Sequence, residues 1–356
     1  MIPAFSYASL LLPLLLAAQP QPGQRQLFEE AAAALGRGDY ARAEAGFQAV
    51  LKTQPGHIGA LGNLGVAYAR QDRYVEAAAI YHRALKLAPR DGALRLNLGL
   101  ALLKQEKYAE ALAALEGLGS PQARELRATA QLNTGAAVAA LQTLEPLPDS
   151  PGVLFLRGLA RLKLGQREEA QAVFAQLEAR LPESQAAFLR GKALFEAGDF
   201  EAAATALTPC PALDCRRELG KVFVSQRQAE AAEREFRTVL AEKPADREAA
   251  YFLGALLLER DQYAEGETLL RGSGAGFWAA RYYLGKAALK QKRIAEALRH
   301  LEAVERERPN DPNLLFQLLR AYQATGNTPR ASHVAARLRA AQARLRDGEQ
   351  AALVLR

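Results

Sequence analysis

The sequence predicts an all-α solenoid of about ten helix-turn-helix repeats, and three observations support that fold class. Residues 61–68 and 94–101 both contain Asn-Leu-Gly followed by an aliphatic residue and alanine. Pro55 and Pro89 lie 34 residues apart, a period typical of stacked supersecondary units. The chain is rich in residues that favour helix, and no run alternates as a β-strand would.

Each repeat is expected to be two antiparallel helices, and the same features mark the repeats in chain order. A small residue in each helix allows close approach, and a proline ends the unit. The small residues of the first helices are Ala31, Gly65, Gly99, Ala128, Gly158, Gly191, Gly220, Gly254 and Gly285. Those of the second helices are Ala43, Ala77, Ala111, Ala140, Ala170, Ala203, Ala232, Gly266, Ala297 and Ala331. The closing prolines are Pro55, Pro89, Pro121, Pro182, Pro209, Pro244 and Pro309.

Four repeats depart from the regular length. The third, fourth, sixth and eighth are three to five residues short. A shorter second helix or loop should change the local rise of the solenoid. The glycine-rich run 272–276 is expected to end the second helix of the eighth repeat, as a hinge or as a tight turn.

These positions resemble the tetratricopeptide repeat family over residues 24–340. The resemblance implies a right-handed solenoid in which the first helix of each repeat lines a concave groove. Arg127 stands where the family usually has leucine, so the fourth repeat is the weakest match. Residues 341–356 are expected to form a capping helix or tail over the last pair.

The N-terminus predicts export. Residues 1–18 carry no charge and contain a leucine-rich core that ends at Ala17 and Ala18, which is typical of a signal peptide cleaved near Ala18. A Pro/Gln linker follows at 19–23, and the protein is then periplasmic or secreted. Because no Lys or Arg precedes the core, an uncleaved N-terminal membrane anchor and a cytoplasmic protein are the alternatives. Membrane contact is expected only through an uncleaved segment, since no other stretch approaches about 20 apolar residues.

The second half of the concave groove is predicted to be basic with aromatic walls. In the family, positions 5 and 9 of the first helix face the groove, and aromatic residues at position 5 also contribute to packing. A basic, aromatic groove suits a protein or peptide partner with acidic and apolar residues, although a solvated basic face is the alternative. The predicted groove residues are Lys192, Arg217, Lys221, Lys286, Arg320, Phe188, Tyr251, Tyr282 and Phe316. In the first half, the corresponding apolar residues include Val66, Leu100 and Leu159.

Charge and motif content argue against catalysis and nucleic-acid binding. The formal net charge of +7 permits acidic partners, but an arginine-rich solvated surface also explains it, and no nucleic acid is expected. The four histidines are scattered, and no nucleophile, base or metal-ligand pattern accompanies them. We therefore expect no enzyme, no metal and no cofactor.

Cys210 and Cys215 are the only two cysteines, and they lie at the junction of the sixth and seventh repeats. Two cysteines without a nearby histidine cannot complete a four-ligand zinc site. In an exported chain they could form a disulfide, and the alternative is a pair of reduced thiols in the core.

The sequence therefore predicts a non-catalytic scaffold that binds a protein or peptide partner in its groove. The resemblance implies an exported bacterial protein of the cell envelope. A cytoplasmic adaptor, similar to co-chaperones of this family, is the alternative if residues 1–18 are not a signal.

Overall fold

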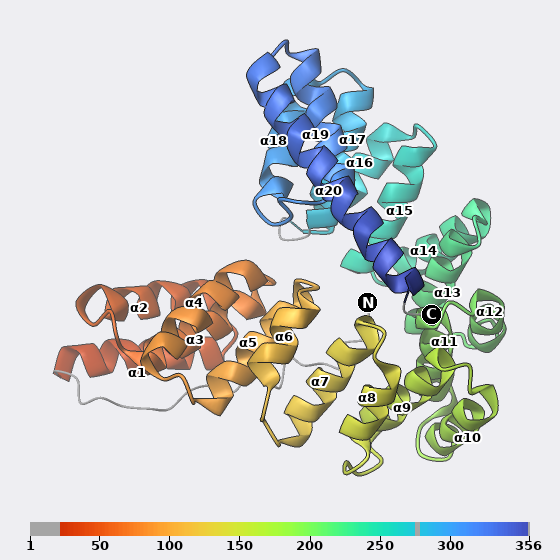
Figure 1. Cartoon of the computed structure of the whole chain (residues 1–356), viewed down its shortest axis with the longest axis horizontal. Helices are drawn as coiled ribbons and strands as arrows, with labels where there is room; N and C mark the ends of the chain where they lie inside the picture. Colours follow the sequence, from red (N-terminus) through yellow and green to blue (C-terminus); the bar gives the residue numbers. More distant parts are fainter. Residues whose placement is uncertain (1–21, 275–277, 355–356) are drawn as a thin grey trace. The chain divides into compact units, whose positions relative to one another are not determined.

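Figure 1 shows the computed structural model, which describes residues 22–274 and 278–354. The described residues form twenty helices and no strand, which confirms the all-α prediction. Contacts divide the chain into two units, Met1–Cys215 and Arg216–Arg356. The predicted signal peptide lies outside the described residues, and α1 begins at Pro22, within the predicted linker.

The first unit contains six helix pairs. Its helices are α1 (Pro22–Gly36), α2 (Tyr40–Thr53), α3 (Ile58–Arg70), α4 (Tyr74–Leu87), α5 (Gly92–Lys104), α6 (Tyr108–Leu115), α7 (Pro121–Asn133), α8 (Ala137–Leu144), α9 (Pro151–Lys163), α10 (Arg167–Glu178), α11 (Glu183–Glu196) and α12 (Phe200–Leu207).

The second unit contains four pairs, and its first helix begins just before the unit boundary. These helices are α13 (Leu213–Ser225), α14 (Ala229–Glu242), α15 (Arg247–Glu259), α16 (Tyr263–Gly272), α17 (Trp278–Lys290), α18 (Ile294–Glu305), α19 (Pro312–Ala324) and α20 (Thr328–Val354). In both units each helix packs on the next one in the chain, as expected of a solenoid.

In the seven first helices that have a glycine at this position, the glycine packs against a bulky side chain of the partner helix. A Cβ placed on Gly158 would lie 2.5 Å from the Phe174 ring, and one on Gly220 would lie 2.7 Å from the Phe236 ring. Carbon atoms do not approach so closely without displacement, so only glycine fits at these positions with the ring in place. The predicted repeat register is confirmed by these contacts.

The four short repeats lose their residues from the second helix. Helices α6, α8 and α12 have 8 residues each and α16 has 10. The second helices of the first, second, fifth, seventh and ninth repeats have 12 to 14 residues. The predicted shortening is confirmed, and it falls on the second helix because the first helices of the short repeats keep 13 or 14 residues.

The turn inside every repeat contains one residue with left-handed backbone geometry. Such a conformation favours glycine because it has no Cβ to clash with the backbone. Five of these positions are glycine and five are not. The ten residues are Gly38, Asp72, Glu106, Gly135, Gly165, Gly198, Arg227, Asp261, Lys292 and Gly326.

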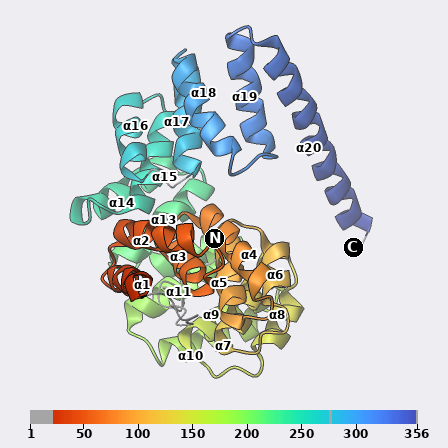
Figure 2. The same cartoon turned by 90° about the vertical axis from the view of Figure 1, so that its left-hand side faces the viewer.

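Two further expectations concern the second unit. Helix α16 ends at Gly272, inside the glycine-rich run as predicted, and Gly274 has a φ of 107°. Residues 275–277 lie outside the described residues. The stretch from residue 341, for which a capping helix or tail is expected, continues α20 as far as Val354, and Figure 2 shows this helix running past the end of α19.

Candidate functional site

The predicted groove residues fall on both sides of the unit boundary. Phe188 and Lys192 lie on α11 in the first unit, and the other seven lie on α13, α15, α17 and α19 in the second. Lys192 is only 7% exposed, and its Nζ lies 5.9 Å from the centre of the Phe188 ring. Because Lys192 is buried and lies beside an aromatic ring, its ammonium group is not exposed for a partner to bind.

Lys221 is also buried, with 8% exposure, and it lies between two carboxylates. Its Nζ is 2.9 Å from Glu218 Oε1 and 3.1 Å from Glu248 Oε1. Burial alone would lower the pKa of Lys221, but the Glu218 and Glu248 carboxylates outweigh it and raise that pKa. The expectation that Lys192 and Lys221 are solvated cations of the groove is therefore wrong.

Arg217 belongs to the same charge network. Its Nη1 is 2.9 Å from Asp246 Oδ2, and its Nε is 3.1 Å from Glu248 Oε2. Asp246 also caps α15 by accepting a hydrogen bond from the Ala249 N–H. The network joins α13 to α15. Its cations pair with carboxylates of the chain itself, so the network stabilises the packing of two neighbouring repeats.

The α17–α19 face, defined here as Tyr282, Lys286, Phe316 and Arg320, is different. These residues occupy matching positions on two helices that pack against each other. Phe316 is 49% exposed, the side chain of Lys286 is 43% exposed, and Arg320 is exposed. This face therefore presents aromatic and cationic groups to solvent.

The charges of the α17–α19 face are weakly held. Lys286 Nζ lies 3.7 Å from Glu259 Oε1 and 5.5 Å from the centre of the Tyr283 ring. Within the described part of the chain, Arg320 has no carboxylate at ion-pair distance, and it donates only a long hydrogen bond of 3.5 Å to Gln317. Burial raises the pKa of Tyr282, an effect that a hydrogen bond with Gln317 partly offsets, so the phenol stays neutral at physiological pH.

Tyr251 lies apart from that face, within an aromatic cluster on α15 and α17. Its ring is 4.9 Å from Phe252 and 6.0 Å from Tyr283, both in edge-to-face geometry. Burial raises the pKa of Tyr251 far above its ordinary value. Tyr251 therefore mainly contributes to the packing of the helices, as aromatic residues at position 5 also do elsewhere in the family.

The apolar row of the first unit is not open. Val66 is 3% exposed, Leu100 is 5% exposed and Leu159 is fully buried. Exposed apolar and cationic groups therefore coincide on the α17–α19 face, and not on this row.

Two models of the tetratricopeptide repeat match most of the chain. They cover residues 28–91, 76–118, 155–208, 217–276 and 278–355. The chain belongs to the tetratricopeptide repeat family. Repeats of this family generally bind proteins or peptides and are generally non-catalytic. No curated protein matches the chain.

One solved structure supports the fold of this tetratricopeptide repeat chain, and two others resemble it more weakly. A tetratricopeptide repeat protein from Parabacteroides merdae superposes with a TM-score of 0.55 at 18% identity, covering 67% of this chain and 100% of that one. The human IFIT1 dimer with PPP-AAAA gives 0.40 at 16% identity, covering 86% and 88%. The Cut9-Hcn1 hetero-tetramer of APC/C gives 0.39 at 14% identity, covering 89% and 79%.

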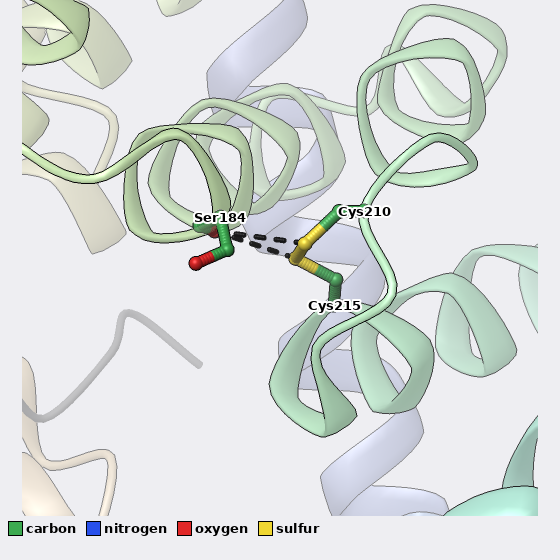
Figure 3. The surroundings of a disulfide bond; sticks show 3 residues. All are labelled: Ser184, Cys210 and Cys215. Carbon is green, nitrogen blue, oxygen red and sulfur yellow. Dashed lines mark hydrogen bonds between the residues drawn. A yellow bond between two sulfur atoms is a disulfide. The ribbon is translucent and has the colours of Figure 1, made fainter.

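The two cysteines of the repeat chain form a disulfide, with Cα atoms 6.0 Å apart. Figure 3 shows both sulfurs beside the Ser184 carbonyl oxygen, 3.7 Å from Cys210 Sγ and 3.5 Å from Cys215 Sγ. Cys210 is 7% exposed and Cys215 is fully buried. The disulfide therefore links the end of α12 to the start of α13 and holds both against the start of α11.

The described residues contain neither a metal-ion cluster nor a membrane-spanning helix. Within them, no group of three His, Cys, Asp or Glu side chains is arranged to hold a metal ion. The helices of residues 22–274 and 278–354 include none that is both long and apolar enough to cross a membrane.

Sequence reasoning missed the carboxylates that surround Lys221 and Arg217. Glu218 lies three residues before Lys221 on one helix, a spacing that places both side chains on the same face. Asp246 and Glu248 come from the next repeat, nearly thirty residues later in the chain. The three-residue spacing could have predicted the contact between Glu218 and Lys221. The contacts of Asp246 and Glu248 could be predicted only by knowing how neighbouring repeats pack in three dimensions.

Proposed function

We propose that the second unit binds an acidic peptide segment of a protein partner, and that it does so with the α17–α19 face. The observation that carries this proposal is the exposure of Phe316 next to the solvent-facing guanidinium of Arg320. A half-exposed phenylalanine beside a cation with no carboxylate among the described residues resembles the anchor residues of protein interfaces, which are rich in aromatic side chains and arginine.

The chemistry of the face defines its ligand. Phe316 and Tyr282 offer ring surface to one apolar side chain. Arg320 can hold a carboxylate through two parallel hydrogen bonds, and Lys286 can add a second charge. Lys286 can turn to the ligand because its contact with Glu259 is long and largely solvated. Arg217, Lys192 and Lys221 act as structural supports in this proposal.

A peptide library displayed on phage and selected on the immobilised chain provides probes. The enriched peptides are expected to carry Asp or Glu next to Leu or Phe, and their affinity should fall as salt rises. Replacing Phe316→Ala together with Arg320→Glu should weaken binding about tenfold or more. The control is Arg299→Glu on α18, which removes an exposed arginine outside the face and should leave affinity unchanged. Equal affinity for all three chains would contradict the proposal.

We further propose that the protein acts in the cell envelope after export. The leucine-rich, uncharged residues 1–18 support this location, as does a disulfide, because disulfides persist mainly in oxidising compartments. Mass spectrometry of the native protein should find a mature N-terminus near Gln19. An intact Met1 on protein from the cytosol would instead support a cytoplasmic adaptor, and it would leave the peptide-binding proposal standing.

A further inference from the structure

A hollow of about 780 Å³ lies in the first unit, between α10, α11 and α12. These three helices are at the lower right of Figure 1. Helix α12 has 8 residues and α10 has 12, so the shortened second helix of the sixth repeat leaves α10 with less neighbouring surface. The hollow is therefore a local consequence of the short repeat, separate from the α17–α19 face.

The floor of the hollow is apolar and small. The name floor is used here for the alanines of α11 and α12 that line the hollow, namely Ala186, Ala187, Ala202 and Ala206. Side chains of this size leave room for the methylene groups of a long side chain to lie against the floor. Pro209 also lines the hollow.

Acidic residues outnumber basic ones around the hollow. Four carboxylates, those of Glu178, Glu183, Asp199 and Glu201, face two arginines, Arg167 and Arg190. Arg167 pairs with Asp199 at 2.9 Å and Arg190 pairs with Glu178 at 3.1 Å. Glu183 and Glu201 are exposed, and no described residue forms an ion pair with either. The hollow thus has an excess of two negative charges, four carboxylates minus two arginines.

The disulfide holds two lining residues of the hollow, Glu183 and Pro209, in place. Pro209 directly precedes Cys210, and Glu183 directly precedes Ser184, whose carbonyl lies against both sulfurs. A ligand would therefore meet a wall that is already in place, which lowers the entropy lost on binding.

We infer that this hollow binds a lysine- or arginine-rich segment of a protein partner. The alkyl part of a basic side chain lies on the alanine floor, and its charged end reaches Glu183 and Glu201. Charge complementarity supports this ligand class, because the hollow has an excess of two carboxylates although the chain as a whole has a net charge of +7. A cation that binds here is attracted by the carboxylates that line the hollow.

A fluorescently labelled oligo-arginine peptide, titrated into the full chain at low salt, tests the inference by anisotropy. It should bind to the unmodified chain, and unlabelled oligo-arginine should compete for the same place. Glu183→Gln combined with Glu201→Gln should weaken oligo-arginine binding about tenfold. Both residues lack ion pairs among the described residues, so the fold should remain intact by circular dichroism.

The matched control is Glu168→Gln combined with Glu169→Gln. It removes the same charge from exposed positions on α10 that do not line the hollow. Ala206→Leu is the steric counterpart, since it fills the floor without changing charge, and it should weaken binding as well. Absence of oligo-arginine binding, or an equal loss in the two double variants, would overturn the inference.

Discussion

At the scale of single residues, Gly158 and Gly220 leave no room for a side chain, whereas the lysines of the first helices differ widely in exposure. The glycines that pack against rings or leucines were identified from their spacing alone, because a side chain has no room there. Lysines were less predictable. Lys221 and Lys286 occupy the same repeat position, but one is buried between carboxylates and the other is half-exposed. Repeat position therefore did not determine burial, which depends on the residues of the adjacent repeat.

The first prediction concerns these two lysines. Lys221→Ala removes a cation that lies 2.9 Å from the buried carboxylate of Glu218, and it should lower the free energy of unfolding by about 3–5 kcal/mol. Lys286→Ala should cost less than about 1 kcal/mol, because a largely solvated ion pair contributes little. Urea denaturation of both variants checks the contrast, and similar losses would contradict the assigned burial.

The second prediction concerns the left-handed turn residues. Lys292 has a φ of 60° and is exposed, so Lys292→Gly should relieve backbone strain and stabilise the chain by roughly 0.5–1 kcal/mol. Gly165 has a φ of 75° with no atom near its missing Cβ, so Gly165→Ala should destabilise through backbone strain alone, by about 1–2 kcal/mol. Opposite shifts of the denaturation midpoint are expected, and shifts of the same sign would refute the turn geometry.

At the scale of helices, neighbouring repeats are joined by recurring charge contacts. Glu44 of α2 accepts hydrogen bonds from the side chains of Gln71 and Arg73 of the second repeat. Glu267 of α16 accepts hydrogen bonds from those of Gln291 and Arg293 of the ninth. The sequence showed these residues only as ordinary surface charges. Their pairing could not be predicted because each partner comes from a different repeat, more than twenty residues away.

The third prediction is the pH dependence of the α13–α15 contact. Burial would raise the pKa of Asp246, but the Ala249 N–H, Arg217 and Lys243 lower it below its ordinary value. A carboxyl whose pKa is lower in the folded chain adds stability above its unfolded pKa of about 3.9 and loses it as pH falls through the folded pKa. The second unit should therefore lose stability below about pH 4.

Asp246→Asn provides the control for that titration. The amide can still cap α15, but it carries no charge for Arg217. The variant should be less stable at pH 7, and its stability should change less between pH 5 and acid than that of the unmodified chain. Thermal melts across this range, followed by circular dichroism, test this. Parallel pH profiles would exclude the contribution of Asp246.

At the scale of the whole chain, the all-helical repeat architecture was predictable because a weak signal recurs ten times. The division into two units was not predicted, since no change in composition accompanies Cys215 and Arg216. The α17–α19 face was only partly predicted. Positions 5 and 9 of the first helices predicted its four residues as part of the groove. The same positions also predicted five residues that are buried, paired or packed elsewhere.

The fourth prediction follows from stability that is local in a solenoid. Gly220→Ala places a Cβ 2.7 Å from the Phe236 ring and should cost roughly 1–3 kcal/mol through overpacking. Hydrogen exchange should quicken first in α13 and α14, because repeats open in neighbouring groups. Amides of α1 to α4 should exchange as before. Gly36→Ala, where no atom lies within 4 Å of the added carbon, should leave every helix unaffected.

The short repeats also show where this architecture tolerates change in length. Helices α6, α8 and α12 end at Leu115, Leu144 and Leu207. Leu115 and Leu207 are the residues that pack against Gly99 and Gly191. The missing residues therefore come after the last contact that the pair requires. Evolution can trim or extend a repeat at this point, and an engineer could graft foreign segments there, with little disturbance of the pair itself.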